Sequence, residues 1–379
     1  MVFTLGSFVL VTVAVAFVSW LKTKGTDETS KDGYFLGGRS LSGLVIFGSL
    51  MMTNLSAEQL VGRNGQGYAA GMTAMGWETM CPIALTLMAL FFIPKYFKLG
   101  ISTIPEFLES RFDRATRVIV SFIFLVAYIV AMLPLVLYAG SVAMERIFGI
   151  TALMGGNRFM ATTVMCVALG IIGGIYAIFG GLKAVAVSDS LNGIIFIIGA
   201  VILIPVLAFI ALGDGSIAEG IRIFATSSPE HLNVIQPADA QPPYIPWPMI
   251  VLGCGINHIS YWCTNQSIMQ RVLGAKNLKE AQKGSLLTGL TCVFCPIFLV
   301  APDVIQFIYY RTVPAVSAGR HQHLPQSDVG LLRCSGSGHR CYGYSGSAHA
   351  ELCAEGCHHC PYRMLWSDDE PSAVPLPVL

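Results

Sequence analysis

The sequence predicts an all-α membrane protein with about eight transmembrane helices. Hydrophobic residues make up 54% of its 379 residues and charged residues only 12%, about half the charged share of a typical soluble domain. Several windows exceed the roughly 18 apolar residues that a bilayer-spanning helix needs. Short polar loops separate these windows. The eight apolar spans lie at approximately residues 2–21, 41–62, 72–94, 118–144, 158–178, 184–212, 246–268 and 285–310.

The first span, residues 2–21, is interpreted as a retained helix rather than a signal peptide. It has no basic segment before it and no small-residue cleavage site after it. Proline and glycine interrupt several later spans, which membrane bundles tolerate better than soluble helices do. The interrupting residues are Pro82, Pro134, Gly173, Gly174, Gly253 and Gly255.

Lysine and arginine are distributed unevenly between the two sets of loops. Loops rich in these residues remain on the cytoplasmic side. On one side, fourteen lysines and arginines lie in loops 22–40, 95–117, 178–184 and 269–284. The loops on the other side hold only four, namely Arg63, Arg146, Arg158 and Arg222. The sequence therefore predicts a multi-pass protein of the cell (inner) membrane with its N-terminus outside. A net charge of +1 and the lack of a basic run give no indication of nucleic-acid binding.

The sequence changes character at about Asp303, so we divide the chain into a transmembrane bundle, residues 1–302, and a tail, residues 303–379. The tail holds six of the eight histidines and five of the eleven cysteines. It has neither helical periodicity nor a hydrophobic core, so we expect it to be disordered or to be aberrant, out-of-frame sequence. A zinc site is the alternative, although paired ligand knuckles are absent. Its candidate ligands are Cys353, Cys357, His358, His359 and Cys360.

The second span, residues 41–62, carries the most informative polar run, TNLSAEQ. An ionisable side chain such as Glu58 is costly inside a membrane-length segment, so it is expected to face a cavity or a partner rather than lipid. Thr53, Asn54 and Ser56 can bond to the backbone in place of helical bonds, which predicts a break in this helix. On a continuous helix Asn54 and Glu58 would share one face, at positions i and i+4.

Six motifs follow one another along residues 1–302. They are GYFLGGRSL at 33–41, TNLSAEQLVG at 53–62, GMTAMGWE at 71–78, GISTIPEFLESRFD at 100–113, IYAIFGGLKAVAVSDSLNG at 175–193 and YWCTNQSIMQRVLGAKNLKEAQKG at 261–284. In order and spacing they resemble the sodium/solute symporter family, and most of all its sugar-transporting, sodium/glucose cotransporter-like branch. This resemblance implies a partial inverted-repeat, LeuT-like helix bundle. In such bundles substrate and ion lie near the bilayer midplane, at helix breaks.

The resemblance also implies a sodium site at the break in the second span. The backbone carbonyls of Met52 and Leu55 would supply part of it, and small hydroxyl residues beyond residue 302 would supply the rest in the family. Asp189 would bind sodium on its way out to the cytoplasm. The alternatives for Asp189 are a salt bridge to Lys183 or a cap at the start of its helix, where an acidic residue suits the helix dipole.

A sugar site needs neutral and anionic hydrogen-bonding groups, because hydroxyls both donate and accept. Asn54, Glu58 and Gln59 on the second span and Glu78 on the third provide such groups. The alternative is that these side chains only join helices through hydrogen bonds across the bundle. The resemblance favours substrate binding for Gln59 and Glu78.

Two aromatic residues complete the expected site. Trp77 stands where the family carries an aromatic residue and could stack on a pyranose ring; the alternative is an anchor at the membrane interface. Tyr261 matches the family's aromatic gate, and the alternative is an ordinary tyrosine of the bundle with a satisfied hydroxyl. This sequence departs from the family at His258, where asparagine is usual, and at Cys292, where the sugar branch has lysine. The particular sugar therefore does not carry over.

These observations predict sodium-coupled symport of a sugar or sugar-like polyol by alternating access. The expected partners are sodium, the substrate and the lipid bilayer, with no nucleic acid and no cofactor besides the coupling ion. The alternatives are a non-transporting, truncated remnant or a substrate-binding sensor of the same family. A membrane enzyme with Glu58 and Glu78 as acid and base is a further class. It lacks support because no nucleophile elbow, metal-ligand pair or phosphate loop accompanies the two carboxylates.

Overall fold

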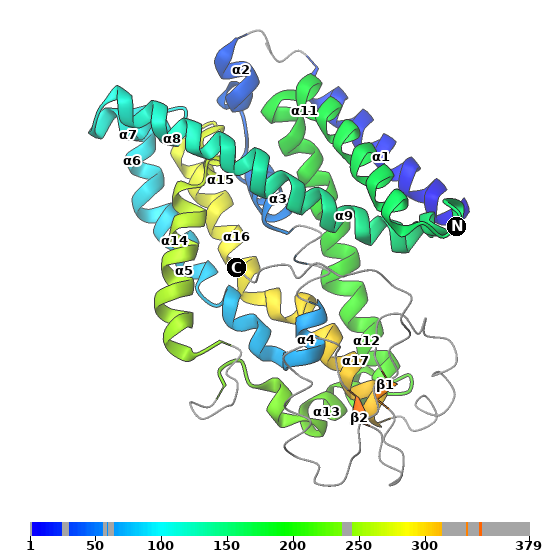
Figure 1. Ribbon diagram of the computed structural model, residues 1–379. Helices are drawn as coiled ribbons and strands as arrows, with labels where there is room; N and C mark the ends of the chain where they lie inside the picture. The colour runs from blue at the N-terminus through cyan, green and yellow to red at the C-terminus, as the bar shows by residue number, and fades with distance from the viewer. Residues whose placement is uncertain are drawn as a thin grey trace. The chain divides into compact units, whose positions relative to one another are not determined.

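The computed structural model describes residues 2–24, 30–55, 59, 64–236, 245–312, 331–332 and 341–342. The chain divides into two units, Met1–Thr312 and Val313–Leu379. The first unit is a bundle of helices (Figure 1). In the second unit the described residues form a short antiparallel ladder of β1 (Leu331–Leu332) and β2 (Cys341–Tyr342). The candidate zinc ligands of the tail lie outside the described residues, and the expected boundary at residue 302 falls within the last helix, α17.

The helices that the structure describes in the first unit follow one another along the chain. Those before residue 200 are α1 (Val2–Thr23), α2 (Lys31–Leu36), η1 (Gly37–Arg39), α3 (Gly43–Asn54), α4 (Asn64–Ala70), η3 (Gly71–Glu78), α5 (Cys81–Leu87), η4 (Met88–Phe92), α6 (Ile93–Leu99), α7 (Ile104–Arg111), α8 (Arg114–Ala127), η5 (Tyr128–Met132), α9 (Leu133–Phe148), α10 (Ile150–Leu153), α11 (Arg158–Phe196) and the start of η6 (Ile197–Leu203). Those after it are α12 (Ile204–Leu212), α13 (Ile217–Ser227), η7 (Pro229–Leu232), η8 (Met249–Cys254), α14 (Gly255–Thr264), α15 (Gln266–Leu273), α16 (Leu278–Leu299) and α17 (Ala301–Thr312).

Five helical segments of the described chain are long and apolar enough to cross a membrane, by length and composition alone. They correspond to five of the eight predicted spans and are Gly6–Thr23, Gly65–Leu99, Arg114–Phe148, Arg158–Ile175 and Gly181–Leu212. Large apolar side chains point outward from them, as Phe122 and Val130 do with 66% and 69% of their surface exposed. Such an apolar exterior is typical of a membrane-facing surface. The other three predicted spans contain the shorter apolar helix α3, the pair η8 and α14, and the pair α16 and α17.

Three of these long helices widen into a π-helical turn just before a proline. The turns η4, η5 and η6 each lead into a helix with proline in its first turn, at Pro94, Pro134 and Pro205. Proline has no N–H group and its ring clashes with the carbonyl four residues earlier. A wider turn relieves this clash while the helix continues. The interruption predicted at Pro134 is therefore a local distortion inside one span.

Helix α3 packs between α11 and α16, which lie on either side of it (Figure 1). Two glycines allow these close approaches. A Cβ atom on Gly48 would lie 2.7 Å from the Cα of Ser190 on α11, and one on Gly284 of α16 would lie 2.7 Å from the Cβ of Ile46. Small residues at such contacts let helix backbones approach closely in membrane bundles. Ile46 and Leu50 of α3 are fully buried as a result.

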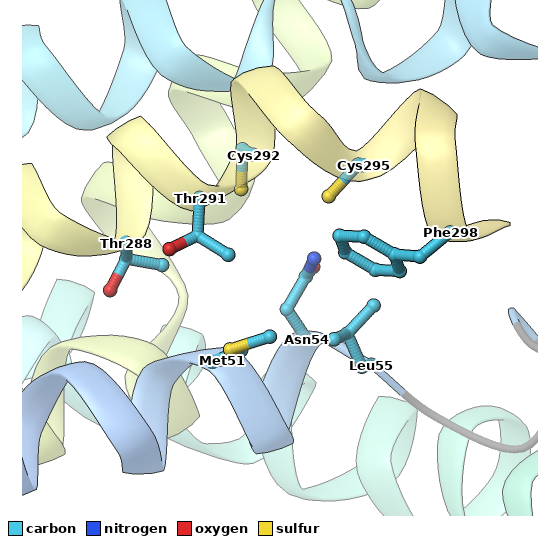
Figure 2. A pocket seen from close by; sticks show the side chains of 8 residues that line it. All are labelled: Met51, Asn54, Leu55, Thr288, Thr291, Cys292, Cys295 and Phe298. Atoms are coloured by element: carbon cyan, nitrogen blue, oxygen red, sulfur yellow. The ribbon is translucent and has the colours of Figure 1, made fainter. Parts of the chain in front are cut away.

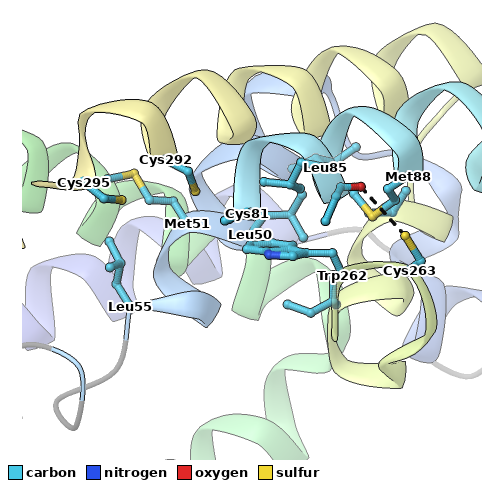
Figure 3. Close-up of a cluster of buried hydrophobic side chains, with 14 of the residues drawn as sticks. Leu50, Met51, Leu55, Cys81, Leu85, Met88, Trp262, Cys263, Cys292 and Cys295 are labelled. Atoms are coloured by element: carbon cyan, nitrogen blue, oxygen red, sulfur yellow. Dashed lines mark hydrogen bonds between the residues drawn. The ribbon is translucent and has the colours of Figure 1, made fainter. Parts of the chain in front are cut away.

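The core beside the end of α3 is rich in sulfur (Figure 3). Side chains from α3 and the residue after it, α5, η4, α14 and α16 meet there, among them Leu50, Met51, Leu55, Cys81, Leu85, Met88, Trp262, Cys263, Cys292 and Cys295. The four cysteines are buried and free of disulfide bonds. One of them, Cys263, donates a weak hydrogen bond to the carbonyl of Ala84, with 3.9 Å between sulfur and oxygen. The polar groups described next border this core.

Candidate functional site

The helix of the second predicted span ends within the bundle. Its last residue is Asn54, and Leu55 has an extended backbone with φ −83° and ψ 91°. The N–H of Leu55 still donates to the carbonyl of Met51, at 2.9 Å. A helix end leaves its last carbonyls without the donors that a continuing helix would provide. The break predicted from the polar run is confirmed, and Met52 and Leu55 both lie at it.

The helix end also corrects one expectation. Asn54 and Glu58 do not share a face of one continuous helix, because α3 stops between them. Thr53 and Asn54 can satisfy backbone groups locally, which competes with helix propagation; the hydroxyl of Thr53 donates to the carbonyl of Ser49 at 2.6 Å. Glu58 and Ser56 lie outside the described residues. Gln59 is described, and its side chain lies against Glu78.

A small cavity adjoins the helix end (Figure 2). Residues of α3 and α16 line it, namely Met51, Asn54, Leu55, Thr288, Thr291, Cys292, Cys295 and Phe298. Its volume is about 10 Å³, roughly what one water molecule needs. The hydroxyls of Thr288 and Thr291 donate to carbonyls of their own helix, at 2.9 and 3.0 Å. Asn54 is therefore the polar side chain that α3 offers to this cavity.

A buried polar cluster lies where η3 and α14 meet. The Nε2 of Gln59 lies 3.5 Å from an oxygen of Glu78, and Glu78 is only 3% exposed. His258 of α14 is 5% exposed, and its Nε2 lies 2.6 Å from the carbonyl oxygen of Trp77. Because a carbonyl only accepts, this nitrogen is the one that donates. Gln59, Trp77 and Glu78 are thus brought together, and His258 joins them.

The two aromatic candidates border this cluster in different ways. Trp77 is half-buried and contributes its backbone carbonyl to His258. Tyr261 is half-buried on α14, three residues after His258, so the two side chains lie on one face of the helix. The ring of Tyr261 packs edge to face on that of Trp262, with 5.3 Å between centroids. The stacking and gating roles predicted for Trp77 and Tyr261 stay predictions.

Asp189 lies in a second polar centre, between α3, α11 and α15. Its Oδ2 accepts a hydrogen bond from the hydroxyl of Ser49 at 2.7 Å and lies 3.5 Å from Nη2 of Arg271. Arg271 also donates from Nε to the same hydroxyl, at 2.9 Å. The sequence-based alternatives for Asp189 are therefore wrong. Its partner is Arg271 rather than Lys183, and it lies eight residues past the non-helical Gly181 of α11, too far for a cap.

Sequence reasoning missed the roles of Ser49 and Arg271. It counted Arg271 only as one positive charge in the loop predicted at residues 269–284. Arg271 is instead part of α15, whose Ile268, Met269 and Val272 are fully buried. A signal was present in the sequence, because these apolar residues surround the arginine at helical spacing. A charged residue on a mostly buried helix needs a partner of opposite sign. Nothing local indicated which carboxylate it would be.

An apolar helix bundle whose buried polar groups gather at a helix end is typical of a membrane transporter. The family model described as "Sodium:solute symporter family" matches residues 34–323. The chain belongs to this family, and it is a multi-pass membrane protein. The family consists of transporters rather than enzymes, in agreement with the sequence-based expectation.

The relatives agree with this assignment. The chain is 45% identical over 309 residues to "Uncharacterized symporter YidK" of Escherichia coli (strain K12), covering 81% of this chain and 53% of that protein. It is 32% identical to a sodium/glucose cotransporter of Vibrio parahaemolyticus, covering 75% of this chain and 51% of the relative. The chain thus spans about half the length of these curated relatives.

A solved structure supports the fold. It shows a substrate-bound, outward-open state of a Na⁺-coupled sialic acid symporter, and it matches with a TM-score of 0.68 and 24% identity. The match covers 83% of this chain and 62% of the other. The predicted fold class, an all-α membrane protein with a partial LeuT-like inverted-repeat bundle, is confirmed.

Proposed function

We propose that this protein carries out sodium-coupled symport of a sugar or sugar-like polyol across the cell (inner) membrane by alternating access. The observation that carries the proposal is the meeting of Gln59 and Glu78, 3.5 Å apart, beside the broken end of α3. An amide and a carboxylate together both donate and accept, as sugar hydroxyls require. The likeness to a sodium/glucose cotransporter supports a substrate of this class.

Sodium is the proposed coupling ion, and no other cofactor is part of the proposal. Its site is the end of α3, where the carbonyls of Met52 and Leu55 lie at the break. Carbonyls at unwound helix ends coordinate sodium in transporters of this architecture. One sodium charge that moves inward contributes about 2.3 kcal/mol per 100 mV of membrane potential. In the proposed orientation the N-terminus lies outside. An inward sodium gradient, together with the membrane potential, then drives the substrate into the cell.

In the proposed cycle, sodium binds first and favours the outward-facing state. Sugar then binds to Asn54, Glu58, Gln59 and Glu78, with Trp77 stacking on the ring. A ligand shifts such an equilibrium only through its differential affinity for the two states. The next step opens the path to the cytoplasm: Tyr261 swings aside as the gate, and sodium leaves past Asp189.

The cavity beside Asn54, at about 10 Å³, is far smaller than a hexose. Binding of a sugar in this cavity therefore requires that the end of α3 and the facing part of α16 move apart. Ligand pockets for molecules of drug size occupy roughly 300–1,000 Å³. This need for movement fits alternating access, in which the same groups line an open site in one state and a closed one in another.

The test is uptake of radiolabelled hexoses by proteoliposomes that contain the full chain, with and without an inward sodium gradient. We expect sodium-dependent uptake, and Gln59→Ala and Glu78→Ala should each raise the half-saturating sugar concentration by about 10–100-fold, since each removes a group that the proposed site offers to the sugar hydroxyls. Arg222→Ala, at an exposed surface pair, is the matched control and should change nothing.

Two results would count against the proposal. Uptake no greater than in empty vesicles would exclude transport by this chain. Equilibrium binding of labelled sugar then separates the two alternatives, because a sensor binds sugar without uptake and a remnant does neither. Unchanged sugar affinity in both Gln59→Ala and Glu78→Ala would overturn the site assignment.

A further inference from the structure

Three buried side chains of different chemistry meet beside the candidate sugar site. Glu78 ends η3, Cys81 begins α5, and His258 lies on α14. One ligand atom from each lies within 4.8 Å of the other two. The exposed fractions are 3% for Glu78, 0% for Cys81 and 5% for His258. A carboxylate, a thiol and an imidazole are thus enclosed together, away from solvent.

The imidazole of His258 has one nitrogen bonded to a backbone carbonyl and the other available to a metal. Its Nε2 donates to the carbonyl of Trp77 at 2.6 Å, which fixes the tautomer and leaves the lone pair on Nδ1. Nδ1 is buried and has no hydrogen-bond partner in the described part of the chain. Metal-binding histidines almost always donate their other N–H group to a carboxylate, a backbone carbonyl or water. His258 already has this outer contact.

The donor set selects one class of cation. Sulfur and imidazole ligands suit Zn²⁺ and related transition metals, whereas Na⁺, Mg²⁺ and Ca²⁺ require oxygen ligands. Around a tetrahedral zinc ion, with metal–ligand distances of about 2.0–2.3 Å, donors lie roughly 3.5 Å apart. The three side chains would have to close by only about 1 Å from their present separation.

Charge balance also favours a divalent cation of the Zn²⁺ class. A thiolate from Cys81, a carboxylate from Glu78 and a neutral His258 carry two negative charges, which one Zn²⁺ neutralises. A neutral complex is far cheaper to bury than one with a net charge. A water molecule as fourth ligand keeps the complex neutral; Cys292 of α16 packs beside Cys81 in the same core (Figure 3).

We propose that Glu78, Cys81 and His258 form a binding site for a divalent transition-metal cation of the Zn²⁺ class. Binding releases the proton of the Cys81 thiol, so the affinity rises with pH. A consequence that rests on the proposed function is that Zn²⁺ competes with sugar, because Glu78 serves both. Metal binding itself is independent of transport and is measured without it.

The experiment uses the full chain purified in detergent, with Zn²⁺ as ligand and Co²⁺ as spectroscopic probe. We expect one metal per chain, a sulfur-to-cobalt charge-transfer band, and mixed sulfur, nitrogen and oxygen ligation in X-ray absorption of the zinc form. Cys81→Ser should abolish the band. Cys81→Ser and His258→Gln should each weaken Zn²⁺ binding by at least about 10–100-fold, the loss that even an outer-shell change causes.

Three further variants make the result specific. Cys263→Ser removes a buried cysteine whose sulfur instead contacts the Ala84 carbonyl, and should leave binding unchanged. Serine in place of Cys353, Cys357 and Cys360 together removes the three cysteines among the candidate ligands of the tail and should also change nothing. Cys81→His keeps a zinc ligand, so it should retain zinc while the charge-transfer band disappears. If Cys81→Ser does not fold, this variant tests whether Cys81 is a ligand. Binding that survives both Cys81→Ser and His258→Gln, or that is lost with the tail cysteines, overturns the proposal.

Discussion

Asp189 and Arg271, 82 positions apart in the sequence, form an ion pair at 3.5 Å that the hydroxyl of Ser49 bridges. Their side chains are only 21% and 15% exposed. Through this contact α11, α15 and α3 share one polar centre. If Asp189 is to receive sodium, it must release Arg271 or share it, so the pair connects the proposed exit path to the position of α15.

Removing one partner of this pair should be strongly destabilising. Arg271→Ala leaves the mostly buried carboxylate of Asp189 without its cation, and the loss of one partner from a buried pair costs about 3–5 kcal/mol. We expect a corresponding loss in the free energy of unfolding of the detergent-solubilised protein, measured by denaturant titration. Arg222→Ala removes the arginine of the exposed Glu219 pair and should have no measurable effect, because water screens that pair. Equal stability of the two variants would contradict the assigned role.

The contact of α3 with α11 leads to a second prediction. Gly48→Ala places a Cβ 2.7 Å from the Cα of Ser190, closer than real Cβ contacts. The helices must then separate, which also weakens the hydrogen bond from Ser190 to the carbonyl of Val45, now 3.0 Å. Overpacking of this kind costs about 1–3 kcal/mol. Thermal unfolding should show a lower midpoint for Gly48→Ala.

The matched control for this variant is Gly173→Ala, within α11. A Cβ there meets nothing within 4 Å among the residues that the structure describes, and alanine is the better helix former by about 1 kcal/mol. Gly173→Ala should therefore be neutral or stabilising. If both glycine variants lower the midpoint equally, close packing at Gly48 is not the cause.

Most of the bundle could be predicted from the sequence because a membrane helix must be long and apolar. The five long segments fall where the hydropathy pattern put them, and the break after Asn54 follows from side chains that compete for backbone bonds. Hydropathy carries no information on tertiary pairing. For that reason the sequence offered Lys183, a neighbour in the chain, as one alternative partner of Asp189, and the actual partner is Arg271.

The candidate site was predictable only in part for the same reason. Gln59 and Glu78 stood out as polar residues in apolar surroundings, and they do lie together. His258 was noticed only as a departure from the family, and Cys81 was not noticed at all, because a lone cysteine in an apolar span is an ordinary core residue. Their proximity to Glu78 depends on how α5 and α14 pack.

The kink in α11 is the basis of a third prediction. Gly181 has φ 53° and ψ −175°, a conformation open almost only to glycine. Gly181→Ala should cost about 1–3 kcal/mol through backbone strain, and its Cβ would also lie 3.1 Å from the carbonyl oxygen of Tyr34. Gly170→Ala in the same helix is the control, since its Cβ would make only an ordinary contact, 3.8 Å from Leu137. A lower thermal midpoint for Gly181→Ala alone is the expected result; equal midpoints would show that the kink tolerates a side chain.

A fourth prediction concerns pH at the start of α8, where Asp113 is the N-cap. Its Oδ1 accepts hydrogen bonds from the hydroxyl and the backbone N–H of Thr116, at 2.6 and 2.7 Å. These bonds hold the pKa of the Asp113 carboxyl below its usual 3.8, the hydroxyl contributing most. Because the pKa is lowered in the folded state, the cap is fully effective above pH 3.8 and is lost as the pH falls through the lowered pKa.

Amide hydrogen exchange at Thr116 measures this loss. The rate should be compared with that of Asp113→Asn at each pH, since asparagine caps equally well without titrating, and the ratio cancels the pH dependence of exchange itself. We expect the ratio of wild type to Asp113→Asn to stay constant from about pH 7 to pH 4 and to rise below that, where only the wild type loses its cap. Asp113→Ala should exchange faster at every pH, because it has no capping oxygen. A ratio that stays constant down to about pH 2 would mean that the charge of Asp113 does not contribute to the cap.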